Sequence, residues 1–137
     1  MRQWHAEEKV QKGLISRSEA LVETAFREVS VFEELGFYNT VISMKASTVQ
    51  ETVEANRSFA QKYDIPLHIG VTEAGPLIGG IVKSTLAFSS LLNDNIGDTI
   101  RVSLSSTPEN EVITANEILK ECGKKSEIVN VELSVDT

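Results

Sequence analysis

The sequence predicts an α/β fold built from parallel βα units. Three short apolar runs begin near residues 40, 67 and 99, and amphipathic helical patterns separate them. Their spacing of about 30 residues is that of one βα unit, which implies parallel strands joined by right-handed crossovers. The runs are almost continuously apolar, as in strands that helices cover or that close into a barrel. The expected element order is therefore α-β-α-β-α-β-α.

The first unit begins after a segment without periodicity. Residues 1–17 show no sustained pattern, and we expect a tail or loop there. From residue 18 apolar residues recur at helical spacing, with Ser16 or Ser18 as the N-cap and Gly36 as the terminating glycine. Residues 40–44 (TVISM) are rich in β-branched side chains, which favours a strand.

The second unit starts with a capping signal. Thr48 and Glu51 have the spacing of a capping box, and the helix that they begin is expected to stop before Pro66. Residues 67–71 (LHIGV) predict the second strand.

The third unit follows a glycine-rich segment. We expect a loop at residues 72–80, a mostly apolar helix at 81–92 and a strand at 99–104 (TIRVSL). Thr107–Pro108 predict the start of a fourth helix, because proline is favoured at the first helical position, and Gly123 ends it.

These units predict one domain at residues 18–123, flanked by residues 1–17 and a tail at 124–137. A chain of 137 residues suffices for one hydrophobic core. Within the tail, residues 127–135 place apolar side chains at every second position, which is compatible with an edge strand.

Composition limits the functional classes. The chain has 13 Lys and Arg against 20 Asp and Glu, a formal net charge of −7, which argues against nucleic acid or an anionic membrane as a partner. No apolar run approaches the roughly 20 residues that span a bilayer, and the N-terminus lacks a signal peptide's hydrophobic stretch, so we expect a cytoplasmic protein. One cysteine, Cys122, and two histidines exclude an internal disulfide and a multi-ligand zinc or histidine metal site.

Polar residues gather where the predicted strands end. Ser43 and Lys45 follow the first strand, Glu73 follows the second, and Arg101 and Ser103 lie in the third. Ligands of parallel α/β proteins bind beyond the carboxyl ends of the strands, so these residues are expected on one rim. A lysine point charge, an arginine fork and two hydroxyls suit a multiply charged anion. The glutamate could bind a substrate hydroxyl or move a proton.

Other polar residues have structural explanations. His68 inside a strand is expected to be a hydrogen-bonded packing residue, and Cys122 is expected to lie in the core. Lys83 and Ser84 are expected in the first turn of a helix, where backbone N–H groups favour anions. From spacing alone, the sequence supports a parallel α/β protein with an anion-binding rim.

Four motifs occur in a specific order: VISMKAS at 41–47, PLHIGVTEAG at 66–75, IVKS at 81–84 and IGDTIRVSL at 96–104. Together they closely resemble the IspG (GcpE) family, the hydroxymethylbutenyl diphosphate synthases of non-mevalonate isoprenoid biosynthesis. The resemblance implies a TIM-type barrel joined to a smaller iron–sulfur domain. It also implies an oxidoreductase that opens the ring of methylerythritol cyclodiphosphate by a two-electron reduction with loss of water.

The resemblance assigns roles to four residues of the predicted rim. Lys45, Arg101 and Ser103 would contact diphosphate oxygens, while Glu73 would hydrogen-bond a substrate hydroxyl and assist proton transfer. Ser43 is added from the strand pattern alone.

Two parts of the family pattern are missing here. An eight-unit barrel needs about 250 residues, so we expect a partial TIM-type barrel, its C-terminal half. The family's 4Fe–4S cluster needs cysteine thiolates, and alignment by the resemblance places Val131 and Ser134 where two cysteines would stand. We therefore expect no cofactor bound by this chain.

Three functions remain open at this point. The chain could be an enzyme fragment that contributes the diphosphate-binding rim but is inactive alone, a stand-alone anion-binding module, or a structural protein that recruits partner strands. Because a half-barrel has two exposed sheet edges and an uncovered apolar strand face, we also expect a homo-oligomer.

Overall fold

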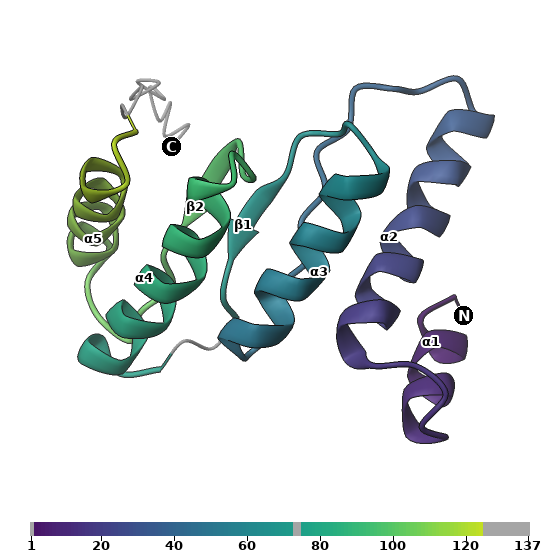
Figure 1. The fold of residues 1–137 in the computed structure, drawn as a ribbon, viewed down its shortest axis with the longest axis horizontal. Helices are drawn as coiled ribbons and strands as arrows, with labels where there is room; N and C mark the ends of the chain where they lie inside the picture. Colours follow the sequence, from purple (N-terminus) through teal and green to yellow (C-terminus); the bar gives the residue numbers. More distant parts are fainter. Residues whose placement is uncertain (1, 73–74, 125–137) are drawn as a thin grey trace, which may run out of the picture.

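The protein is described by a computed structural model that covers residues 2–72 and 75–124 (Figure 1). Within these residues the chain forms five helices and two strands. In chain order they are α1 (Arg2–Gln11), α2 (Arg17–Glu34), α3 (Val49–Lys62), β1 (His68–Gly70), α4 (Leu77–Asn93), β2 (Thr99–Arg101) and α5 (Pro108–Glu121).

The two strands are parallel, as the spacing of the units predicts. Their register pairs His68 with Thr99, Ile69 with Ile100 and Gly70 with Arg101. Both strands are shorter than the predicted ranges 67–71 and 99–104, since regular pairing covers three residues of each.

The predicted strand at 40–44 is wrong as a regular strand. Its pairing reduces to a single parallel bridge between Ile42 and Leu67. Further along, the N–H of Thr72 donates to the carbonyl of Ala46 at 2.9 Å, so residues 42–46 still run parallel to β1. This irregular segment places β1 between itself and β2.

Buried polar side chains of α3 hold the irregular segment. Asn56 Nδ2 donates to the carbonyl of Met44 at 3.3 Å, and Thr52 Oγ1 donates to the carbonyl of Ala46 at 3.3 Å. Both side chains are fully buried. These bonds satisfy backbone groups that a regular ladder would otherwise pair.

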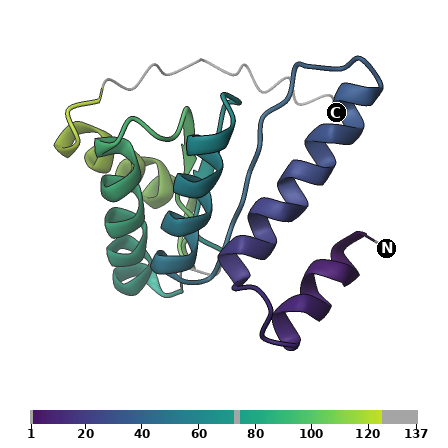
Figure 2. The same ribbon diagram turned by 45° about the vertical axis from the view of Figure 1, so that its right-hand side comes forward.

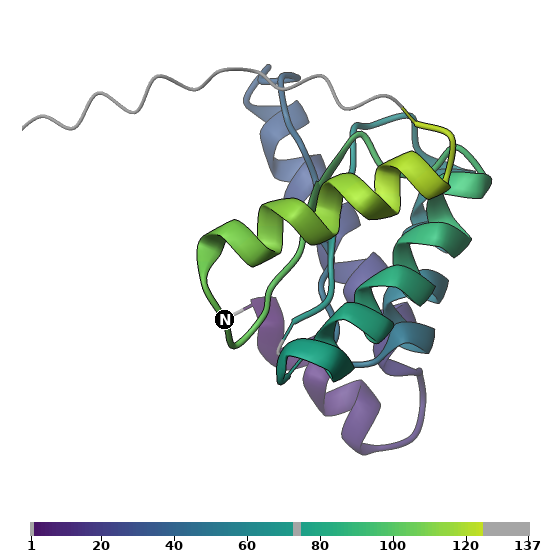
Figure 3. The same ribbon diagram turned by 90° about the vertical axis from the view of Figure 1, so that its left-hand side faces the viewer.

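Helices cover one face of the sheet, and the hydrophobic core lies between these helices and the strands. Figures 1 and 3 show α3 and α4 on one side of the strands. Phe59 of α3 and Phe88 of α4 are fully buried there against Ile69 of β1. The connection at residues 36–48 runs from the far end of α2 back to the sheet (Figure 2).

Two predictions at the helix starts are corrected by the structure. Residues 1–17, expected as a tail or loop, contain α1, which packs against α2 and carries Lys9 at 2.8 Å from Glu23. The loop expected at 72–80 is shorter than predicted, because α4 begins at Leu77. Lys83 therefore lies in the second turn of α4 rather than in the first.

Other terminal signals are confirmed. Of the two serines proposed for α2, Ser16 is the cap: its Oγ accepts from the N–H of Glu19 at 3.2 Å, and the Glu19 carboxylate accepts from the Ser16 N–H at 3.1 Å. Gly36 follows α2 with a φ of 72°, a left-handed conformation that glycine adopts easily. Thr107 and Pro108 begin α5 as predicted.

The predicted edge strand at 127–135, with Val131 and Ser134, lies outside the described residues. In the part of the chain that the structure covers, no helix has the length and apolarity to cross a membrane.

We predict that Asn56→Ala lowers the free energy of unfolding by about 1–3 kcal/mol, because it removes buried hydrogen bonds to two backbone carbonyls. Urea unfolding followed by circular dichroism measures the change. Gln50→Ala, on the exposed side of the same helix, is the matched control. Equal unfolding midpoints for the two variants would contradict the anchoring role of Asn56.

Candidate functional site

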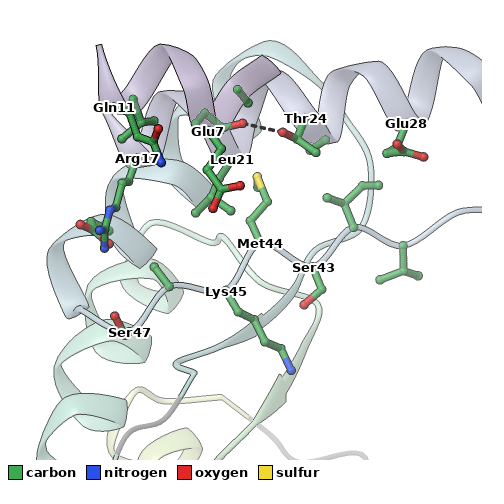
Figure 4. A pocket seen from close by; sticks show the side chains of 18 residues that line it. Glu7, Gln11, Arg17, Leu21, Thr24, Glu28, Ser43, Met44, Lys45 and Ser47 are labelled. Carbon is green, nitrogen blue, oxygen red and sulfur yellow. Dashed lines mark hydrogen bonds between the residues drawn. The ribbon is translucent and has the colours of Figure 1, made fainter. Parts of the chain in front are cut away.

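Alternation along the strands sorts their side chains into two faces. Met44, Ile69 and Val102 point towards the helices and are at most 2% exposed. Ser43 and Lys45 point the opposite way from Met44, as Figure 4 shows. The parallel register therefore gives the sheet one apolar, covered face and one open face.

The open face carries polar residues from all three segments. These are Ser43 and Lys45 from the irregular segment, His68 and Gly70 from β1, and Thr99, Arg101 and Ser103 from β2 and its extension. Ser43, Thr99 and Arg101 are exposed, while Lys45 and Ser103 are half-buried. The expectation of an uncovered apolar strand face is therefore wrong, because alternation directs the apolar side chains to the helices.

The end of the Lys45 side chain lies over Gly70 of β1. A Cβ atom built on Gly70 would lie 3.3 Å from Lys45 Cε and 3.7 Å from Lys45 Nζ. Gly70 is in turn the register partner of Arg101. Lys45 and Arg101 therefore both neighbour Gly70, Lys45 through its side chain and Arg101 through the strand register.

His68 occupies the same open face. Its Nδ1 lies 2.7 Å from Thr99 Oγ1, so the prediction of a hydrogen-bonded histidine is confirmed. Burial of the ring lowers the pKa of His68, and the positive charges of Lys45 and Arg101 lower it further. The neutral imidazole is thus favoured beside two cations.

Four of the five predicted site residues share this face, and the fifth cannot be placed. Glu73 lies outside the described residues, so its catalytic role stays a prediction. Over residues 2–72 and 75–124, no carboxylate lies within 4.0 Å of Lys45 or Arg101. Positive charge held without a neutralising carboxylate in this range favours an anionic ligand.

A second feature is an open cavity of about 820 Å³ between α1, α2 and residues 41–47. Figure 4 shows Met44 directed towards the helices that line it, while the side chain of Lys45 extends away. Thr24, on its wall, donates to the carbonyl of Ala20 at 2.9 Å. Ser43 and Lys45 also border the cavity, so it adjoins the segment that carries the cationic residues. Sequence reasoning missed the cavity because it missed α1.

The chain's residues do not fit an iron–sulfur cluster. The sequence contains one cysteine, Cys122, which is half-buried at the C-terminal cap of α5, rather than in the fully buried core. The structure's described part also contains no group of three metal-binding side chains.

Comparison with known proteins decides the family. Residues 5–116 match the family model of the GcpE TIM-barrel domain. The chain belongs to the GcpE family. This confirms the resemblance that the four motifs indicated. A TIM-barrel domain also agrees with the observed helices and parallel strands.

Among similar curated proteins are those of Treponema pallidum, 64% identical over 111 residues, and Treponema denticola, 63% identical over 109 residues. A third, from Thermodesulfovibrio yellowstonii, is 50% identical over 113 residues. Each is named 4-hydroxy-3-methylbut-2-en-1-yl diphosphate synthase (flavodoxin). The matches cover 81%, 80% and 82% of this chain but only 28%, 28% and 32% of the relatives, so the chain spans less than a third of their length.

We predict that His68 titrates below its usual pKa of 6.5 and that Lys45→Ala raises this pKa, because one repelling charge is removed. Between the folded and unfolded pKa values only the unfolded chain binds the proton. Stability should therefore fall as the pH drops from about 6.5 towards the folded pKa.

NMR titration of the two histidines measures the His68 pKa in wild type and in Lys45→Ala. Lys12→Ala, at an exposed position just after α1, is the control. A His68 pKa at or above 6.5, or one insensitive to Lys45→Ala, would contradict the described geometry.

Proposed function

We propose that this chain binds the diphosphate group of a substrate through the open face of its sheet, as part of the reaction after which its GcpE-family relatives are named. The observation that supports this most is the pair of cationic side chains on one sheet face. Lys45 packs over Gly70, whose register partner is Arg101, and the positive charges of both act on His68, while the described part of the chain places no carboxylate against either.

The residue types on this face suit the oxygens of a diphosphate group. The guanidinium of Arg101 can donate two parallel hydrogen bonds to phosphate oxygens, and the ammonium of Lys45 supplies a point charge. Ser43 and Ser103 add hydroxyl donors on the same face. The proposed ligand is methylerythritol cyclodiphosphate, and Glu73 would hydrogen-bond its hydroxyl group and assist proton transfer.

The reductive step needs parts that this sequence lacks. Ring opening with loss of water consumes two electrons, and one cysteine cannot ligate the family's 4Fe–4S cluster. We therefore propose that the chain contributes the diphosphate-binding part of a partial barrel and is inactive by itself.

We predict that the full chain binds inorganic pyrophosphate and that Arg101→Ala weakens this binding about tenfold to a hundredfold, as loss of charge-assisted hydrogen bonds implies. Isothermal titration calorimetry at fixed ionic strength measures the affinity. Arg27→Ala removes the same charge from α2, where Arg27 pairs with Glu23, and is the control.

Equal affinities for the Arg101 and Arg27 variants would reject the site. If the wild-type chain binds no pyrophosphate, the alternative of a structural fragment is favoured.

A specific observation also supports self-association through the sheet edge. The N–H of Ile42 donates to the carbonyl of Pro66 at 3.0 Å, and its carbonyl accepts from the N–H of His68 at 2.9 Å. Both groups thus face β1, so the backbone groups of Val41 and Ser43 face outwards. An edge of this kind is a template for another strand.

We predict that the chain is dimeric or larger at micromolar concentration and that Val41→Pro shifts it towards monomer, because proline removes an outward N–H without touching the bonds to β1. Sedimentation velocity measures the distribution. The control is Val112→Ala, at an exposed position of α5. A proline there would break the helix. A wild-type monomer would contradict edge pairing.

A further inference from the structure

We propose that Gly70 is a positioning residue of the anion site: its missing side chain leaves the space in which the ammonium of Lys45 reaches the Arg101 side of the sheet. This inference rests on the proposed function, because it assigns a role within the same site. Gly70 has no side chain, so its role depends on the space that it leaves.

The contact geometry carries the proposal. A Cβ on Gly70 would lie 3.3 Å from Lys45 Cε and 3.3 Å from the backbone carbonyl oxygen of Arg101. Both distances are tighter than ordinary van der Waals contact, so each contact has to be relieved by a shift of a few tenths of an ångström if a methyl group is added.

Lys45 is the neighbour that can move. The carbonyl of Arg101 can shift only slightly, because Gly70 and Arg101 are register partners in the parallel sheet. The backbone around Lys45 is fixed as well, since Met44 and Ala46 accept hydrogen bonds from buried side chains of α3. What remains free is the flexible side chain of Lys45, whose Cε would shift by a few tenths of an ångström and carry the ammonium away from its position over Gly70.

Backbone conformation does not explain the glycine. Gly70 has no positive φ, so an alanine there is conformationally allowed. Gly97 differs, because its φ is 110° and a Cβ there would lie 2.7 Å from Ile69 Cδ1. A strand glycine without a special φ marks a close approach of another group, and here that group is the lysine side chain.

The proposal makes a prediction about coupling. Gly70→Ala keeps every charge, yet it should weaken pyrophosphate binding about tenfold, as displacement of one charge-assisted contact implies. In a Lys45→Ala background the same change should have a much smaller effect, because the displaced side chain is gone and only the contact with the Arg101 carbonyl remains. Damage to the fold alone would weaken binding equally in both backgrounds.

The experiment is a double-mutant cycle on the full chain, with wild type, Gly70→Ala, Lys45→Ala and the double variant titrated with pyrophosphate. Gly79→Ala is the control, since a Cβ there would meet only Pro76 Cγ at 4.0 Å. Non-additive losses support the proposal. A Gly70→Ala affinity equal to that of wild type, or additive losses, overturns it.

A second readout separates this inference from the proposed function. NMR titration of His68, which lies near Lys45, reports displacement of the lysine without any ligand. If pyrophosphate does not bind to wild type, the proposed function fails, while equal shifts of the His68 titration in the Gly70→Ala and Lys45→Ala variants would still support the displacement. If His68 in Gly70→Ala titrates as in wild type, the inference fails.

If Gly70→Ala alone does not fold, the proposal requires that the double variant with Lys45→Ala does. An unfolded double variant would place the conflict at the Arg101 carbonyl and overturn the assignment.

Discussion

The register of the irregular segment against β1 is the constraint on which the site depends. Side chains alternate between sheet faces, so a slip of one residue would turn Lys45 towards the helices and Met44 towards solvent. The bridge between Ile42 and Leu67 and the hydrogen bond from Thr72 to Ala46 fix this register. Buried Asn56 and the neighbouring Thr52 reinforce it from α3, so the position of a surface cation is set by polar groups within the core.

The cationic face also contrasts with the rest of the molecule. The chain has a formal net charge of −7, which opposes the approach of an anion at long range. At the salt concentration of a cell, however, such fields decay over about 8 Å. Recognition of a diphosphate by this face would therefore depend on the short-range geometry of Lys45 and Arg101 rather than on the overall charge.

The sequence predicted the class of fold and the membership of the open face for a simple reason. Parallel order follows from the spacing of the units, and the face follows from alternation, so Ser43, Lys45, Arg101 and Ser103 could be grouped before any coordinates were known. The uncovered face was predicted as apolar because the strands were considered as whole runs. Counting every second residue would have shown it to be polar.

The features that the sequence did not predict depend on partners distant in the chain. α1 has a weak pattern of its own, and it is supported by packing on α2 and by the Lys9–Glu23 ion pair. The segment PLIGG has the composition of a loop, yet most of it belongs to α4, which begins at Leu77. Pro76 directly precedes the first helical turn, where its missing N–H costs no helical hydrogen bond. The space above Gly70 is visible only when Lys45 is placed across it.

Site and sheet edge are coupled through solvent exposure. Arg101 is exposed in this chain, and a charge in water interacts with an anion far more weakly than one in a protein interior. The outward backbone groups of Val41 and Ser43 lie on the same segment as Lys45, so a strand added there would cover one side of the cationic face. Exclusion of water would strengthen the attraction of both cations for a diphosphate. On the proposed function, pairing at the edge and affinity at the face should therefore rise together, since one added strand changes both.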